Sequence, residues 1–147
     1  MTAPARPAIL ALMSPGNVER FQQIVRQWQE HRRVAPELLT EDVEWVNPPD
    51  AVEPGSRRGA DGFNEAITSI YEGWDESHFE PERVIENGDD LIALGELRAR
   101  GRAMDLEVRQ PHGQIWTFRD GRVARMSWFS THADTLDAAG LPREEDL

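Results

Sequence analysis

His112 is the residue whose type and setting most favour proton chemistry near neutral pH. It stands between Pro111 and Gly113, a combination that predicts a bulge or bend in a strand, and bulges often direct side chains toward active sites. An imidazole in a pocket exchanges protons near pH 7. A histidine exposed in a Pro-His-Gly turn fits the same residues, so both interpretations stay open.

Asp50 is the second candidate for moving a proton. It follows Pro48 and Pro49 just after the first predicted strand, where a loop would hold its carboxylate beside Asn47. An aspartate after two prolines is more often an ordinary turn residue. We therefore keep Asp50 as a candidate catalytic base, with the turn as its alternative role.

Missing residue types exclude several other chemistries. All 16 basic residues are arginine, and a chain without lysine forms no Schiff base and has no Walker-type phosphate lysine. The absence of cysteine excludes thiolate nucleophiles, thiolate metal sites and disulfides. No pair among the four histidines has HExxH or HxH spacing, and no serine lies in a GxSxG motif. We expect no metal and no cofactor.

Large apolar side chains indicate what a pocket would bind. Met126 alternates with tryptophan on the last predicted strand, and three tryptophans fall on predicted inner strand faces: Trp45, Trp116 and Trp128. Such a lining favours a small, flat ligand that is apolar or aromatic. The same rings fit a solid core equally well, and a core position is the preferred interpretation for Trp28 and Trp74.

Four polar residues fall among these rings on the same predicted faces: Asn47, His112, Gln114 and Ser130. Buried amide, imidazole and hydroxyl groups orient a ligand through hydrogen bonds. The candidate ligand-binding set therefore joins these side chains to the apolar ones.

Helices must cover these faces, and the first half of the chain predicts them. Apolar spacing indicates a helix over residues 15–33, capped by Ser14, and Pro36 opens a short second helix. Residues 43–47 alternate as a strand, and an irregular loop follows. Asp61 caps a third helix with apolar residues four, three and four apart: Phe63, Ile67, Ile70 and Trp74.

After Ser77 the pattern changes to a period of two, which predicts a meander of strands. Asp120-Gly121 predicts a tight hairpin, and a short helical turn ends at Gly140. The predicted strands are 78–85, 91–100, 106–110 with 114–119, and 122–131. This order predicts an α+β fold in which a cone-shaped, curved antiparallel sheet is covered by three N-terminal helices. We expect one domain over residues 15–141, with tails at 1–14 and 142–147.

Composition limits the partners. The chain has 147 residues and a net charge of −11, and an acidic surface repels nucleic acid. The apolar run Ala8–Met13 is too short for a membrane span or a signal peptide, so we expect no membrane partner. The lack of cysteine fits a cytoplasmic protein.

From roughly Val18 to Leu141 the chain resembles the SnoaL-like proteins of the nuclear transport factor 2-like (NTF2-like) superfamily, and the C-terminal part carries the signature. The run Ile115–Met126, with its Asp-Gly turn, and the stretch Asp137–Leu141 match the family's strand, turn, strand and "EALEAAGL"-type tail. The resemblance implies a curved sheet wrapped around a pocket, ligand positions on the inner face, and a homodimer joined through the outer face of the sheet.

The resemblance also implies catalytic positions, and this chain departs from several of them. In relatives with ketosteroid isomerase activity a carboxylate base ends the first strand, where this chain has Asn47, which cannot take a proton at neutral pH. The only tyrosine, Tyr71, lies on the third predicted helix, and the oxyanion aspartate's position falls at or near Gln114. For the Asp-Arg-Asp cluster of related epoxide hydrolases, this chain offers only Arg102 and Asp105 as counterparts.

Two functions remain open. One is an isomerase, cyclase or dehydratase that transfers a proton on an apolar or aromatic metabolite, with His112 or Asp50 moving the proton. The other is a non-catalytic binding or assembly module that has lost the family's carboxylate.

Overall fold

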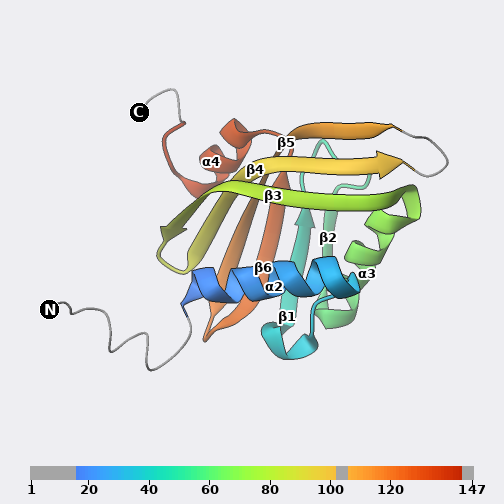
Figure 1. The fold of residues 1–147 in the computed structure, drawn as a ribbon. Helices are drawn as coiled ribbons and strands as arrows, with labels where there is room; N and C mark the ends of the chain where they lie inside the picture. The colour runs from blue at the N-terminus through green and yellow to red at the C-terminus, as the bar shows by residue number, and fades with distance from the viewer. Residues whose placement is uncertain (1–15, 102–105, 144–147) are drawn as a thin grey trace, which may run out of the picture.

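A strongly bent sheet and the helices against it make up the computed structural model, which describes residues 16–101 and 106–143 (Figure 1). The elements follow in this order: α2 (Asn17–His31), the 3₁₀ turn η1 (Pro36–Leu38), β1 (Leu39–Asn47), β2 (Gly55–Arg58), α3 (Gly59–Gly73), β3 (Trp74–Asn87), β4 (Asp90–Gly101), β5 (Glu107–Arg119), β6 (Arg122–Phe129) and α4 (His132–Ala139). The predicted tail at 1–14, the Ser14 cap and the candidates Arg102 and Asp105 lie outside the described residues.

The six strands form one sheet in the order β2-β1-β6-β5-β4-β3. Antiparallel pairs join β3 to β4, β4 to β5 and β5 to β6, which confirms the predicted meander and the α+β class. β1 pairs in parallel with β6, so the sheet is mixed and not wholly antiparallel as predicted. The chain passes through β2, α3 and β3–β5 between these two strands. β2 lies where we expected an irregular loop, and it pairs with β1.

Two tight turns join strands of the meander, and the one at Asp120-Gly121 lies where the sequence predicts it. Gly88 and Asp89 join β3 to β4, and Gly88 has a positive φ of 64°. Asp120 and Gly121 join β5 to β6 with φ values of 54° and 79°, the pair of left-handed residues that a type I′ hairpin requires.

The bulge predicted around His112 is wrong. β5 runs unbroken through Pro111, and its register with β4 has no shift from Asp90↔Thr117 to Arg100↔Glu107. Pro111 is tolerated because the pairing of β5 with β6 ends at Gly113↔Phe129, so its missing N–H interrupts no bond on that side.

The sheet bends at the pairing of β3 with β4. The register shifts between Pro81 and Arg83, and Gly95 lies opposite Pro81. A Cβ atom on Gly95 would collide with the main-chain oxygen of Glu80, so the glycine permits the close approach of the two strands. This bend gives the sheet a concave face, which α2 crosses in Figure 1.

Amphipathic helices bury their apolar faces against the sheet. α2 buries Phe21 and Ile24, and α3 buries Phe63 and Ile67 among the side chains of one core cluster. α3 begins at Gly59, so Asp61 lies in its first turn and does not cap it. An acidic side chain in this turn still stabilises the helix through its attraction to the positive end of the helix dipole.

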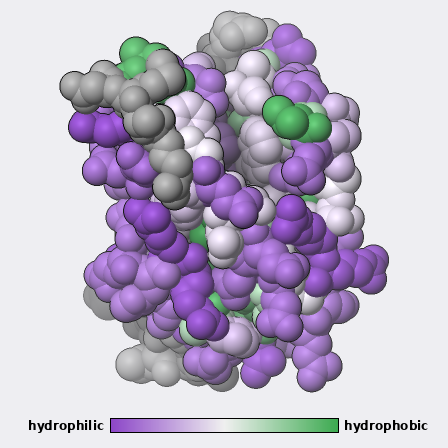
Figure 2. Space-filling view, turned by 90° about the vertical axis from the view of Figure 1, so that its right-hand side faces the viewer, coloured by the Kyte–Doolittle hydropathy of each residue, from purple (hydrophilic) through white to green (hydrophobic). Residues whose placement is uncertain are grey.

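On the convex face α4 packs Leu136 on a second cluster with Ile92, Leu94 and Ile115. Thr131 caps α4, because its side chain accepts a hydrogen bond from the amide of Asp134. On the face shown in Figure 2, apolar residues are visible only in small areas between hydrophilic ones. None of the described helices is long and apolar enough to cross a membrane.

Candidate functional site

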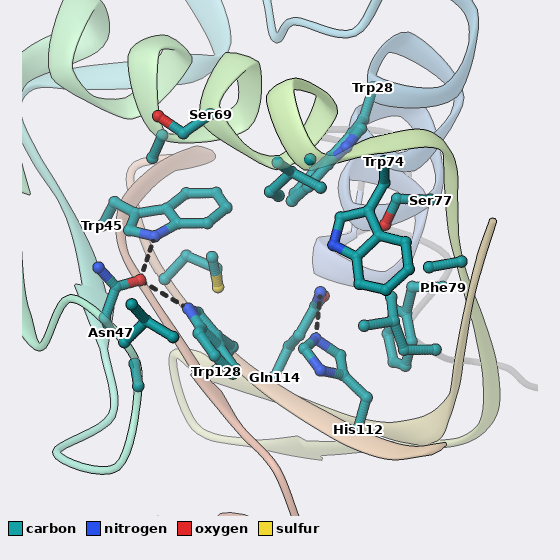
Figure 3. Close-up of a pocket in the computed structure, with 18 of the residues that line it drawn as sticks. Trp28, Trp45, Asn47, Ser69, Trp74, Ser77, Phe79, His112, Gln114 and Trp128 are labelled. Atoms are coloured by element: carbon teal, nitrogen blue, oxygen red, sulfur yellow. Dashed lines mark hydrogen bonds between the residues drawn. The ribbon is translucent and has the colours of Figure 1, made fainter. Parts of the chain in front are cut away.

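A cavity of about 830 Å³ lies between the concave face of the sheet, the inner sides of α2 and α3, and the loop after β1 (Figure 3). Its lining is mostly apolar, and all five tryptophans of the chain take part in it: Trp28, Trp45, Trp74, Trp116 and Trp128. A largely apolar cavity of this size with a few polar groups is the usual form of a small-molecule site.

The structure brings seven of the nine predicted site residues to the cavity: Trp45, Asn47, His112, Gln114, Trp116, Met126 and Trp128. The other two, Asp50 and Ser130, are not in its lining. Asp50 is exposed in the turn after β1. Ser130 lies in the bend after β6, so the strand alternation that places Trp128 inward has already ended.

Asn47 holds two of the rings in place. Its Oδ1 accepts hydrogen bonds from Trp45 Nε1 at 2.8 Å and from Trp128 Nε1 at 2.7 Å (Figure 3). Its Nδ2 donates to the main-chain oxygen of Glu53 at 2.9 Å, which ties the loop after β1 to the strand. The amide oxygen is therefore already used by the protein, and the second Nδ2 hydrogen is what Asn47 can offer a ligand.

Gln114 has a similar arrangement on β5. Trp116 Nε1 donates to Gln114 Oε1 at 2.8 Å, and Gln114 Nε2 lies 3.2 Å from His112 Nε2. Since the indole only donates and the amide nitrogen only donates, His112 Nε2 must be the acceptor in its neutral form. The proton of the imidazole is then on Nδ1, for which the described residues provide no hydrogen-bond partner.

His112 is in an apolar setting that keeps it neutral. It is 7% exposed, lies edge-on to Phe79 with ring centroids 5.1 Å apart, and stacks on Trp128 at 5.6 Å. Burial, with a smaller effect from the nearby His132, lowers the pKa of His112 from 6.5 to about 4. At neutral pH the side chain therefore presents a neutral N–H donor.

Trp28 and Trp74, interpreted from sequence as core residues, line the cavity as well. Trp28 Nε1 donates to the hydroxyl of Tyr71 at 3.2 Å, and that hydroxyl donates to the main-chain oxygen of Ser77 at 3.3 Å. Tyr71 thus holds Trp28 from α3. Helical spacing alone does not distinguish a ring in a core from one at the edge of a cavity.

Sequence reasoning missed the charged residues of the lining. Glu53 and Arg57 line the cavity from the segment that we expected to be an irregular loop. The pairing of Arg57 with Trp45 gives β2 its register, and the segment Gly55–Arg58 has no alternation of apolar residues that would predict it. Among the described residues no group of three or more His, Asp or Glu side chains is arranged to hold a metal ion.

A bent sheet, helices against its concave face and an apolar cavity between them define an NTF2-like α+β fold. The SnoaL-like domain matches residues 12–126, and the chain belongs to this family.

Solved structures share the fold. A protein assigned as a SnoaL-like polyketide cyclase, from Jannaschia sp. CCS1, is 18% identical with a TM-score of 0.70, over 95% of this chain and 99% of that one. TerC, co-crystallised with polyporic acid, is 20% identical with a TM-score of 0.66, over 82% and 95%. A Catenulispora acidiphila protein with a ketosteroid isomerase-like fold, in complex with trimethylamine, is 12% identical with a TM-score of 0.67, over 86% and 95%. No curated protein matches the chain significantly.

Proposed function

We propose that the protein binds a small, flat, mostly apolar molecule in the cavity and directs a ligand oxygen to the Nδ1–H of His112. The observation that carries the proposal is the neutral, buried imidazole: its Nε2 is occupied by Gln114, and the rings around it are apolar. A desolvated donor of this kind favours an oxygen acceptor and discriminates against a ligand that lacks one.

Two further polar groups of the lining, Asn47 and Gln114, support the same orientation. The side-chain oxygens of Asn47 and Gln114 are already bonded to indole N–H groups, so both amides can add only a hydrogen to a ligand. The complexes of TerC with polyporic acid and of the Catenulispora protein with trimethylamine add the support that related folds hold small molecules.

Proton transfer by the same site is the second candidate, and one observation favours it. A neutral imidazole donor can polarise a ligand carbonyl, and Glu53 is the one carboxylate in the described lining that could take the adjacent proton. Asp50, the base suggested by the sequence, lies outside the lining, so His112 and Glu53 replace His112 and Asp50 as the pair to test.

Calorimetric titration with two ring-matched probes tests the proposal: 2-acetonaphthone, which has a carbonyl oxygen, and 2-ethylnaphthalene, which has none. We expect the ketone to bind more tightly to the wild-type protein. His112→Phe, which retains an aromatic ring between Phe79 and Trp128, should weaken the ketone about tenfold and leave the hydrocarbon nearly unchanged.

Absence of binding for both probes, or equal loss of both in His112→Phe, would contradict the proposal. The same samples distinguish binding from catalysis. Deuterium uptake at the methyl group of the ketone in D₂O, lost in Glu53→Gln, would indicate proton transfer, and binding without uptake would indicate a binding protein.

A further inference from the structure

We infer that the ligand carries an anionic group and that the guanidinium of Arg57 binds it. The inference rests on the proposed function and names the class of ligand: a flat aromatic or apolar acid, such as a carboxylate or an ionised enol.

The position of Arg57 comes from the pairing of β2 with β1. Arg57 lies opposite Trp45 in an antiparallel pair, so the two side chains project from the same face of the sheet. Trp45 lines the cavity and is 3% exposed, and Arg57 lines the cavity and is half-buried. A Cβ atom on Gly62 of α3 would lie 3.3 Å from the Cβ of Arg57, so the helix supports the start of this side chain.

The guanidinium of Arg57 has no counter-ion among the described residues. The neighbouring Arg58 pairs with Glu44 at 3.8 Å, and Glu53, the other charged residue of the lining, makes no ion pair with Arg57 within 4.0 Å. A partly desolvated cation without a partner is unfavourable, and an anion entering the cavity would provide one. Because the net charge is −11, a local cation would also offset the repulsion between an acid and the rest of the protein.

Three polar side chains elsewhere in the lining agree with this class of ligand. His112, Asn47 and Gln114 each offer hydrogens to a ligand and no side-chain oxygen, so they select acceptors. A planar guanidinium binds a carboxylate or a pair of oxygens through two parallel hydrogen bonds. An acid with a second oxygen on its ring would satisfy Arg57 at one end and the donors at the other.

Three probes with one ring system test the charge of the ligand: 2-naphthoate, 2-naphthamide and (2-naphthylmethyl)trimethylammonium. We expect calorimetry on the wild-type protein to show 2-naphthoate binding at least about tenfold more tightly than the neutral amide, with the cation weakest. The affinity of 2-naphthoate should fall with added salt, while the affinity of the amide stays constant.

The substitutions Arg57→Gln and Arg58→Gln are a matched pair, since each removes one positive charge from neighbouring positions of β2. Arg57→Gln should abolish the preference for 2-naphthoate and retain binding of the amide, whereas Arg58→Gln should keep the preference.

If both variants lost the preference for 2-naphthoate equally, the preference would come from the overall electrostatic potential of the protein and not from Arg57, and the inference would be overturned. Equal binding of acid and amide, or preference for the cation, would also overturn it, while the proposed function would survive. If the wild-type protein binds none of the three probes, the proposed function fails, and the inference fails with it.

Discussion

Asn47 shows how one side chain sets the shape of the site. Its oxygen accepts from two indoles while its nitrogen donates to the loop after β1, and only an amide provides both at one position. The family resemblance placed a carboxylate base here in isomerase relatives. In this chain the position instead has a structural role that depends on the amide, because it fixes two rings and the loop after β1.

Replacing this amide should therefore cost stability by a predictable amount. Asn47→Leu leaves two indole N–H groups without an acceptor and should lower the free energy of unfolding by about 2–4 kcal/mol. Asn47→Asp keeps an oxygen that accepts from both indoles and loses the donor to the main-chain oxygen of Glu53, so its loss should be nearer about 1 kcal/mol. Urea unfolding of the three proteins measures the difference, and an equal loss for both variants would argue that the indole bonds contribute little.

Strand alternation was the signal that located most of the site. It placed Asn47, Gln114 and Trp128 on inner faces, because successive side chains of a strand point to opposite sides. The signal ends where a strand ends, which is why Ser130 was assigned to the lining and does not lie there. Asp50 and Arg57 belong to a segment without periodicity, so the sequence held no local information on which of them approaches the cavity.

At the scale of elements, β5 and α4 depend on one glycine. A Cβ atom on Gly113 would collide with the side chain of Thr135, which is completely buried on α4. The glycine therefore lets α4 lie on the convex face of the sheet. It also follows directly after His112 on β5, so the helix packs behind the strand segment that presents the imidazole to the cavity.

Gly113→Ala should displace α4 and lower the free energy of unfolding by about 1–3 kcal/mol, as expected for overpacking of a tight contact. Gly73→Ala is the control, because a Cβ atom there meets nothing within 4 Å and its φ is not positive. Urea unfolding should show the loss for Gly113→Ala alone. A neutral Gly113→Ala would mean that α4 adjusts without cost.

Local patterns predict the order of the helices and of every strand except β2, the Asp120-Gly121 turn and the final helix. They could not predict that β1 pairs with β6, because the partners lie far apart in the chain: Trp128 donates to Asn47 across 81 residues. They also misplaced a bulge, since the Pro-His-Gly sequence is compatible with a regular strand once its neighbour β6 has ended. Tertiary pairing decided both points.

At the scale of the whole molecule, burying His112 makes stability depend on pH. The unfolded chain binds a proton at this residue below its ordinary pKa of 6.5, whereas the folded protein resists until about pH 4. Between these values the unfolded state holds more protons, so acid favours unfolding. The free energy of unfolding therefore has its full value, as far as His112 is concerned, above pH 6.5. It declines as the pH falls toward 4, by at most on the order of 3 kcal/mol.

Comparison of the wild-type protein with His112→Gln isolates this contribution, since all other titrating groups are common to both. The difference in free energy of unfolding between them should be constant above pH 7 and shift in favour of the variant between pH 6.5 and 4.5. Parallel pH profiles would show that His112 protonates as easily in the folded protein as in the unfolded chain.

The outer face of the sheet is where a homodimer is expected from the family resemblance. Arg98 there lies 3.2 Å from Glu80 and 3.0 Å from Glu96, in partly exposed ion pairs that add little stability to a single chain. The dimer and a cytoplasmic location both stay predictions.

The gathering of every tryptophan around one cavity has an optical consequence. Indole dominates the near-ultraviolet fluorescence of a protein, so the emission of this chain arises from the walls of its pocket and from no other region. An aromatic ligand that enters would change the surroundings of several of these indoles, and so the emission. The unlabelled protein is thus its own sensor of occupancy.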